Sequence, residues 1–202
     1  MFSETVYLPD LRFKGSRNYL HGTDIIPALE KRIAPELGGF LREIRFHLPI
    51  RGVPILAFEP PSESTNGQPC VEAVWSLEGG EKTIKAWLYD SGTQISERTE
   101  YREDLATEGF MVTDSSGSGA GYTSFSILEN VVAMTKRLNL SLYDPSPRQY
   151  LFARARFHGS LPATWSEIEV KCYPVGSQRA TNNHVFVDSS RCADLLFMVG
   201  SF

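Results

Sequence analysis

The chain of 202 residues carries an approximate internal repeat, which constrains its fold more than any other feature. Arg45-Phe46-His47 returns as Arg156-Phe157-His158, an offset of 111 residues (45 to 156). Two further pairs share this offset: Val74-Trp75 with Val185-Phe186, and Trp87-Leu88 with Met198-Val199. A repeat of this length exceeds the period of about 20–50 residues that marks solenoids. The pattern therefore predicts two similar half-domains, with any active site at their junction.

Each half contains one segment with helical spacing, followed by four segments with β-strand character. The apolar face of the first expected helix, over residues 23–33, consists of Ile25, Ile26, Leu29 and Ile33. Thr23 or Asp24 is its expected N-cap. The second expected helix covers residues 124–138, with Asn139 as its stop signal. The expected strands cover residues 40–47, 53–58, 69–77 and 82–89 in the first half, and 149–158, 164–173, 184–188 and 194–199 in the second.

This order of elements predicts a fold of the α+β class. Each half reads as a short strand, such as an edge strand within residues 5–13, then a helix and a four-stranded antiparallel meander. A long sheet wrapped around one mostly buried helix is the hot-dog arrangement, and two copies in one chain make a double hot-dog. The expected boundaries are 1–92 for the first repeat, 93–109 for the connection and 110–202 for the second repeat. An antiparallel β-barrel or sandwich with two incidental helices is the alternative.

Composition excludes several classes of function. Apolar residues make up 42% and charged residues 22% of the chain, as in soluble globular proteins. A net charge of −4 leaves no basic excess for binding nucleic acid or a membrane surface. Three cysteines without a CxxC motif (Cys70, Cys172 and Cys192) predict free thiols and no zinc or other metal site. Residues 1–5 lack the features of a signal peptide, and the longest apolar run near the C-terminus, residues 195–199, is far too short for a membrane span. We therefore expect a cytoplasmic protein.

Two windows of the sequence resemble hot-dog 3-hydroxyacyl-thioester dehydratases. Phe125–Met134 is similar to their central helix, with an acidic residue inside an apolar stretch. His21, followed by Ile26-Pro27-Ala28-Leu29, is similar to their histidine loop, although the fuller Gly-His-Phe-Pro pattern of the family is absent. The resemblance implies that His21 of one half and Glu129 of the other meet across the junction. It also implies an acyl-CoA or acyl-carrier-protein substrate and no cofactor. The protein is then expected to be a monomer, as a pseudo-dimer of its two halves, or a homodimer.

The chemistry of dehydration suits this pair of residues. The reaction needs a base for the α-proton and an acid for the departing hydroxyl group. Histidine titrates near neutrality, so His21 is the expected base. A carboxyl buried on an apolar helix face has its charged form disfavoured, so Glu129 is the expected acid partner. In the alternative interpretation, His21 is an ordinary loop residue and Glu129 a solvated helix residue.

Further residues are candidates for binding substrate: Asn18, Tyr19, Gly22, Asp24 and Tyr122. Asp24 is expected to cap its helix more readily than to catalyse. The Gly/Ser-rich segment Gly117–Gly121 is expected to be a flexible loop, or else an anion-binding nest. A second enzymatic possibility is a hot-dog thioesterase, in which Asp24 or Glu129 activates water. A third possibility is a non-catalytic module that binds a ligand or assembles with partner proteins.

Overall fold

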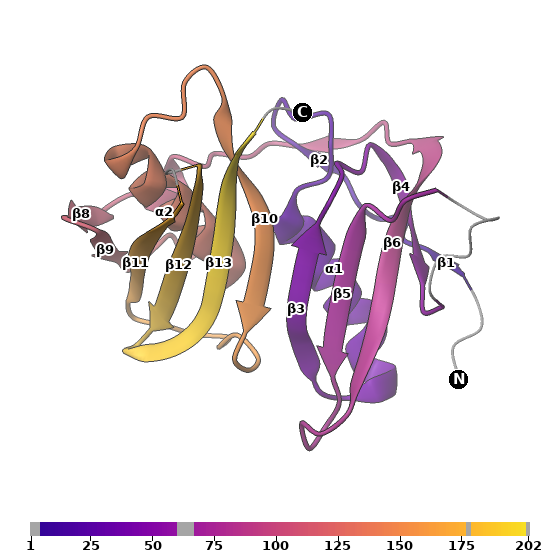
Figure 1. Ribbon diagram of the computed structural model, residues 1–202. Coiled ribbons are helices and arrows are strands. Elements are labelled where there is room, and N and C mark those ends of the chain that lie inside the picture. The colour runs from indigo at the N-terminus through magenta and orange to yellow at the C-terminus, as the bar shows by residue number, and fades with distance from the viewer. Residues whose placement is uncertain (1–4, 60–66, 177–178, 201–202) are drawn as a thin grey trace. The chain divides into compact units, whose positions relative to one another are not determined.

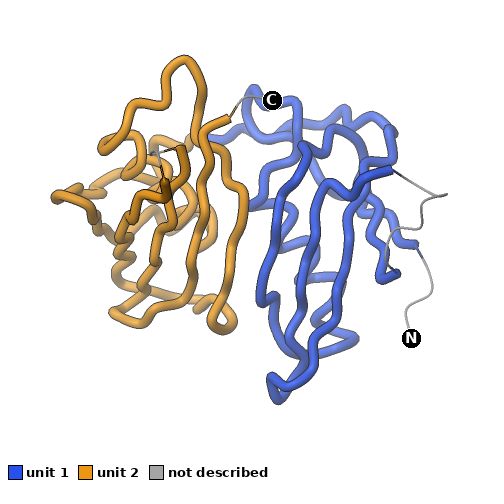
Figure 2. Tube along the Cα trace, in the orientation of Figure 1, with its two compact units in different colours: residues 1–101 blue, residues 102–202 orange. Residues whose placement is uncertain are grey.

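The chain forms two compact units, residues 1–101 (unit 1) and residues 102–202 (unit 2), as Figure 2 shows. The structure is a computed structural model that describes residues 5–59, 67–176 and 179–200. The expectation of no signal peptide concerns residues 1–5, and residues 1–4 lie outside the described ranges. Within the described ranges, no helix is both long enough and apolar enough to cross a membrane.

Unit 1 is a helix packed on an antiparallel sheet (Figure 1). Its elements are β1 (Val6–Tyr7), β2 (Phe13–Lys14), α1 (Gly22–Leu37), β3 (Phe40–Phe46), β4 (Gly52–Ala57), β5 (Val71–Ser76), β6 (Thr83–Gln94) and β7 (Arg98–Thr99). Across the sheet the strand order is β1-β4-β6-β5-β3, and every neighbouring pair is antiparallel. A separate short ribbon joins β2 and β7 in parallel. The expected apolar face of α1 is buried, because Ile25, Ile26, Leu29 and Ile33 are each no more than 1% exposed.

Unit 2 repeats this plan. Its elements are η1 (Leu105–Thr107), β8 (Met111–Thr113), β9 (Ser116–Gly119), α2 (Ile127–Leu142), β10 (Gln149–Phe157), β11 (Ile168–Val175), β12 (Ala180–Val187) and β13 (Ser190–Gly200). The strand order within the unit is β10-β13-β12-β11-β9-β8, again with antiparallel neighbours. Figure 1 shows α2 against one face of this sheet.

The two units share the order of elements along the chain but not the order of strands across the sheet. In each unit the last two strands of the large sheet form a hairpin, β5–β6 in unit 1 and β12–β13 in unit 2. In unit 1 the first strand of the hairpin pairs with the strand that follows the helix, whereas in unit 2 the second one does. The expectations of a common strand order and of a simple meander are therefore wrong. Turn residues specify a hairpin, but long-range packing decides which of its edges meets the other strands.

For Val74-Trp75 and Val185-Phe186, the offset of 111 residues consequently matches strands without matching their inward faces. Trp75 of β5 is 2% exposed and its indole Nε1 donates to the carbonyl of Gly38, at 2.6 Å. Its counterpart Phe186 of β12 is only half-buried, and the Lys171 ammonium lies 4.8 Å from the centre of its ring. Because side chains alternate between the faces of a strand, a slip of one residue exchanges the buried and exposed sets.

Both helices begin or end at positions that differ from the expected ones. Helix α1 starts at Gly22, so its N-cap is His21, which makes no capping hydrogen bond through its side chain. The expected caps, Thr23 and Asp24, lie inside the helix and bind Lys14 instead. Asn139 does not stop α2, which continues to Leu142. It is fully buried, and its amide oxygen accepts a hydrogen bond from the Cys172 thiol.

The Gly/Ser-rich segment is mostly a strand rather than a flexible loop or a nest. Residues 116–119 form β9, which pairs with β8 on one side and β11 on the other. Glycine is required here because a Cβ at Gly117 would lie 2.4 Å from Cζ of Phe110. Phe110 is 4% exposed and covers this strand. The glycines therefore allow close packing of an aromatic ring.

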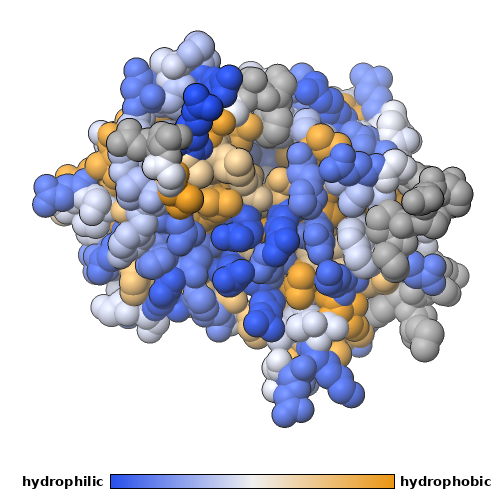
Figure 3. Space-filling view, in the orientation of Figure 1, coloured by the Kyte–Doolittle hydropathy of each residue, from blue (hydrophilic) through white to orange (hydrophobic). Residues whose placement is uncertain are grey.

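The cysteines and the surface agree with the sequence prediction of a globular protein with free thiols. The three cysteines are free, which confirms that prediction. Burial raises the pKa of Cys172 and of Cys192 to about 11, so both thiols are protonated at neutral pH. Figure 3 shows hydrophilic residues covering most of the viewed face, with hydrophobic residues in separate groups.

Candidate functional site

A buried polar cluster lies at the start of α1, in unit 1. The Nδ1 atom of His21 is 2.7 Å from the Thr23 hydroxyl, and the Lys14 ammonium donates to the same hydroxyl oxygen at 3.0 Å. Thr23 is only 2% exposed, while His21 at the helix end is half-buried. The three side chains therefore form a hydrogen-bonded chain from a cation to a partly accessible imidazole. We call this group, together with Asp24 and Tyr101, the Lys14 cluster.

An ion pair fixes the position of the lysine. Lys14 is 8% exposed, and its Nζ atom lies 2.8 Å from Oδ1 of Asp24. Asp24 stands in the first helical turn, where the helix dipole favours a negative charge. A buried ammonium requires a partner, because an uncompensated charge in the interior is strongly unfavourable. Asp24 thus serves to hold Lys14, which leaves it poorly suited to activate water as a thioesterase residue.

Aromatic contacts complete the cluster. The Lys14 ammonium lies 4.9 Å from the centre of the Tyr101 ring, and the Arg17 guanidinium lies 5.5 Å from it. The ring of His21 is 6.2 Å from that of Tyr101 and tilted by 41°. Cations over an aromatic face are attracted by its quadrupole, so Tyr101 stabilises both positive side chains. Tyr101 comes from the end of unit 1, which brings the predicted connection 93–109 into the site.

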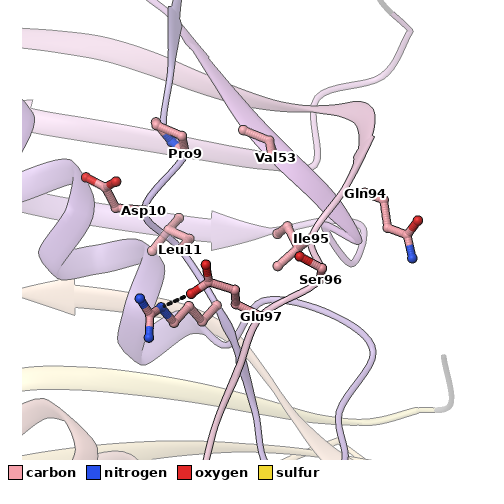
Figure 4. A pocket seen from close by; sticks show the side chains of 9 residues that line it. Pro9, Asp10, Leu11, Val53, Gln94, Ile95, Ser96 and Glu97 are labelled. Carbon is pink, nitrogen blue, oxygen red and sulfur yellow. Dashed lines mark ion pairs between the residues drawn. The ribbon is translucent and has the colours of Figure 1, made fainter.

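The ribbon of β2 and β7 connects the cluster to a hollow in the surface of unit 1 (Figure 4). The hollow has a volume of about 340 Å³, which is within the usual range of ligand pockets. Its lining comes from residues 9–12, Val53 and residues 94–97. Arg12 and Glu97, which both line the hollow, form an ion pair of 2.8 Å. The residues that follow them, Phe13 and Arg98, pair with each other in the ribbon. The chain therefore passes from the wall of the hollow directly to Lys14.

Glu129 lies in unit 2, where it takes part in a capping box. Its Oε2 atom accepts hydrogen bonds from the backbone N–H and the hydroxyl of Ser126, both at 2.8 Å. Ser126 Oγ in turn accepts from the Glu129 backbone N–H at 3.2 Å. Glu129 is half-buried in the first turn of α2. The spacing of Ser126 and Glu129 is a known signature of helix starts and could have been recognised in the sequence.

The next residue, Asn130, is the fully buried polar side chain at this end of α2. Its Oδ1 atom accepts from the Tyr122 N–H at 2.7 Å, and its Nδ2 group donates to the carbonyls of Tyr122 and Ser126, each at 3.0 Å. The Cα of Gly121 packs so closely that a Cβ there would lie 2.8 Å from Oδ1. Asn130 therefore holds the segment that leads into α2.

The remaining predicted residues divide between the two units. Asn18 is exposed and Tyr19 half-buried in the loop before α1, and Gly22 is the buried first residue of the helix. Tyr122 is 36% exposed in unit 2, with its ring 5.6 Å from that of Phe125. Unit 1 thus brings His21, Gly22 and Asp24 together. The pairing of His21 with Glu129 and the role of Tyr122 in binding substrate stay predictions.

Sequence reasoning missed three members of the cluster: Lys14, Thr23 as a side-chain partner, and Tyr101. Lys14 looked like part of a polar loop, and no local pattern predicts that a lysine will be buried. Among residues 5–59, 67–176 and 179–200, no group of three or more His, Cys, Asp and Glu side chains is placed to hold a metal ion.

Comparison with known proteins gives matches in structure but not in sequence. No family model matches the chain, and no curated protein sequence matches it. A candidate thioesterase II from Thermobifida fusca YX is 13% identical, with 98% of this chain and 92% of that chain covered and a TM-score of 0.50. The bifunctional dehydratase-cyclase domain in ambruticin biosynthesis is 12% identical, with 97% and 90% covered and a TM-score of 0.48. A candidate oleoyl thioesterase from Lactobacillus plantarum is 10% identical, with 98% and 96% covered and a TM-score of 0.43.

Of these three, the first reaches a TM-score of 0.50, and at 13% identity it shows the fold alone. The fold is a double hot-dog. Helices α1 and α2 are its two central helices, each followed by four strands of its own unit that belong to the large sheet. The predicted α+β class is confirmed, and the alternative of a barrel or sandwich with incidental helices is wrong, because both helices carry a buried face. The Lys14 cluster accordingly lies at the N-terminus of the first hot-dog helix.

Proposed function

We propose that this double hot-dog protein binds and processes acyl thioesters of coenzyme A or of an acyl carrier protein. The preferred reaction is dehydration of a 3-hydroxyacyl thioester, or the reverse hydration of an enoyl thioester. The single observation that carries the proposal is the His21 imidazole, held by a buried Lys14–Thr23 chain at the start of the first hot-dog helix. A half-buried ring bonded to a buried hydroxyl, which a buried ammonium holds in turn, indicates a group that is positioned to act on a ligand.

Several features of the site support this choice. A thioester gathers negative charge on its carbonyl oxygen when the α-proton leaves, and a site that stabilises this charge needs preorganised donors. The cluster supplies an imidazole at a helix end, held in place through Thr23 by the buried Lys14 ammonium. The names of the structural neighbours, which include both dehydratases and thioesterases, point to the same substrate class. Glu129 remains the proposed partner of His21 from unit 2.

The test is a panel of thioesters with short, medium and aromatic acyl groups. Hydration of enoyl thioesters is followed by loss of the conjugated absorbance, and hydrolysis by release of thiol. His21→Ala should lower hydration by about 10²- to 10⁴-fold, the usual range for a group that transfers a proton or donates to the developing oxyanion. His47→Ala is the matched control, since His47 is an exposed histidine of the same unit that follows β3. It should leave the rate within about twofold of wild type, as expected for a residue outside the machinery.

Further variants separate the alternatives. Glu129→Gln keeps an acceptor for the capping box, so a large loss of activity in a folded variant would give Glu129 a chemical role. Losses from His21→Ala and Glu129→Gln should not add if the two act as a unit. Thiol release without hydration would identify a thioesterase instead. No turnover of any thioester by the folded protein would contradict the proposal and favour a non-catalytic ligand-binding module.

A further inference from the structure

We infer that Lys14 and Thr23 hold the neutral His21 ring as its Nε2–H tautomer, which makes His21 a hydrogen-bond donor toward the thioester carbonyl. The tautomer follows from the geometry of the Lys14 cluster, whereas its use toward a thioester rests on the proposed function. Lys14 and Thr23 are thus positioning residues for His21. The role differs from that of the base expected from the sequence.

Hydrogen-bond counting around the Thr23 hydroxyl supports the tautomer. The hydroxyl has one proton to donate and two lone pairs that accept. Lys14 is a donor only, so its bond of 3.0 Å occupies one lone pair of Oγ1. In the part of the chain that the structure describes, the second polar partner of Oγ1 is Nδ1 of His21, at 2.7 Å. If Nδ1 carried a proton and donated it, the buried hydroxyl proton of Thr23 would have no acceptor there.

The alternative arrangement satisfies every group. Lys14 donates to Oγ1, the hydroxyl donates its proton to Nδ1, and the proton of the neutral ring then lies on Nε2. A buried donor without an acceptor costs more free energy than an average hydrogen bond contributes, and Thr23 is 2% exposed. The tautomer of a histidine is set by the hydrogen bond at its other ring nitrogen, and here that bond is made by Thr23.

Electrostatics act in the same direction. The Lys14 ammonium is locked 2.8 Å from Asp24 and lies over the Tyr101 ring, so it stays bonded to Thr23. A proton on Nδ1 would point toward an oxygen that already accepts from a cation. A lone pair on Nδ1 avoids this repulsion between positive charges.

The consequence for the site is a neutral imidazole that offers an N–H to a ligand. Such a donor polarises a carbonyl group and makes the adjacent α-proton more acidic, without itself giving up a proton. The α-proton would then pass to another group, and a carboxylate is a base at neutral pH. Glu129 would then be the base that takes the α-proton, and the carboxylic acid so formed would return a proton to the departing hydroxyl group as water leaves.

The tautomer can be measured directly by NMR on protein labelled with ¹⁵N in its histidine rings, at a pH where the rings are neutral. The chain has four histidines, and His21→Gln identifies the signals of His21 by their loss. In wild type we expect the proton on Nε2 and an acceptor shift on Nδ1. Thr23→Val should move the tautomer ratio about fivefold or more toward Nδ1–H, as expected from the loss of one hydrogen bond. Thr23→Ser should restore the wild-type spectrum.

A matched control comes from unit 2. Thr135 is also fully buried in a helix, and its hydroxyl donates to the Val131 carbonyl. Thr135→Val should leave the His21 signals unchanged. A wild-type spectrum with the proton on Nδ1 would overturn the inference, even if a variant failed to fold. So would a tautomer ratio that is the same in wild type and Thr23→Val. Because no thioester is present in this experiment, its result is independent of whether the proposed function holds.

Discussion

Removing the Asn130 side chain should destabilise unit 2 more than any surface substitution. Asn130 is fully buried, and its amide group makes one hydrogen bond to the Tyr122 N–H and two to the carbonyls of Tyr122 and Ser126. In Asn130→Ala the Tyr122 N–H loses this partner, whereas the carbonyls of Tyr122 and Ser126 keep only their backbone donors. The segment before α2 then keeps the bond from Trp165 to the Ala120 carbonyl and the capping box, but loses the side chain that joins it to the buried face of the helix.

The magnitude follows from these bonds. A net contribution of about 1 kcal/mol for each gives a loss of about 3 kcal/mol. For a chain of this size, this corresponds to a fall in Tm of about 6–12 °C. Asn130→Asp is the informative comparison, because it keeps the acceptor for the Tyr122 N–H but places a second oxygen against two carbonyls. Its stability should therefore also fall, even though its shape is nearly unchanged.

Two measurements check this expectation. Urea unfolding followed by circular dichroism gives the loss in stability, and hydrogen exchange of the Tyr122 amide reports on the bond itself. Protection of that amide should disappear in Asn130→Ala and persist in part in Asn130→Asp. Asn182→Ala is the control, since Asn182 is half-buried on β12 and makes one weak contact, of 3.5 Å, with His184. If Asn130→Ala unfolds at the same urea concentration as this control, the hydrogen bonds do not organise the segment and the reasoning is refuted.

Three further predictions test other parts of the structure. Glu129→Ala should cost about 0.5–2 kcal/mol in the urea experiment because it removes the capping box, while Glu129→Gln should cost less. Burial, with a smaller contribution from Arg191, lowers the pKa of His184 below 6.5. Protonation of His184 is therefore less favourable in the folded protein than in the unfolded chain. The free energy of unfolding should fall as the pH drops below about 6.5, and it should fall less in His184→Gln. Gly39→Ala should lower Tm more than Gly79→Ala: both glycines have positive φ, but a Cβ at Gly39 would lie 1.9 Å from a carbonyl oxygen and one at Gly79 would meet nothing within 4 Å.

The sequence predicted which elements form better than how they pair. Helical spacing located α1 and α2, and alternation located the eight long strands, because each pattern depends on neighbours along the chain. The pairing of β3 with β5 and of β10 with β13 depends on contacts between distant segments, which no local pattern encodes. Phe110 illustrates the same limit, since its packing over Gly117 converts a Gly/Ser-rich segment into a strand.

The candidate site was predictable to a similar degree. The sequence identified His21 and its place before a helix, because histidine near a helix start has a recognisable chemistry. It did not identify Lys14, whose burial depends on Asp24 ten residues away and on Tyr101 at the far end of the unit. Glu129 was assigned a catalytic role although the Ser126-to-Glu129 spacing also fits a capping box, and the structure contains that box.

The most direct test of the account is to titrate ¹⁵N-histidine-labelled protein with an acyl-pantetheine analogue whose thioester is replaced by an amide. The carbonyl group is retained, so the analogue can accept a hydrogen bond but resists turnover. We expect a saturable shift of the His21 Nε2 signal while the His47 signals stay unchanged. In Thr23→Val this response should be lost although the variant is still folded. Saturable binding that leaves the His21 signals unmoved, or no binding at all by the folded protein, would contradict the claim that His21 contacts an acyl thioester.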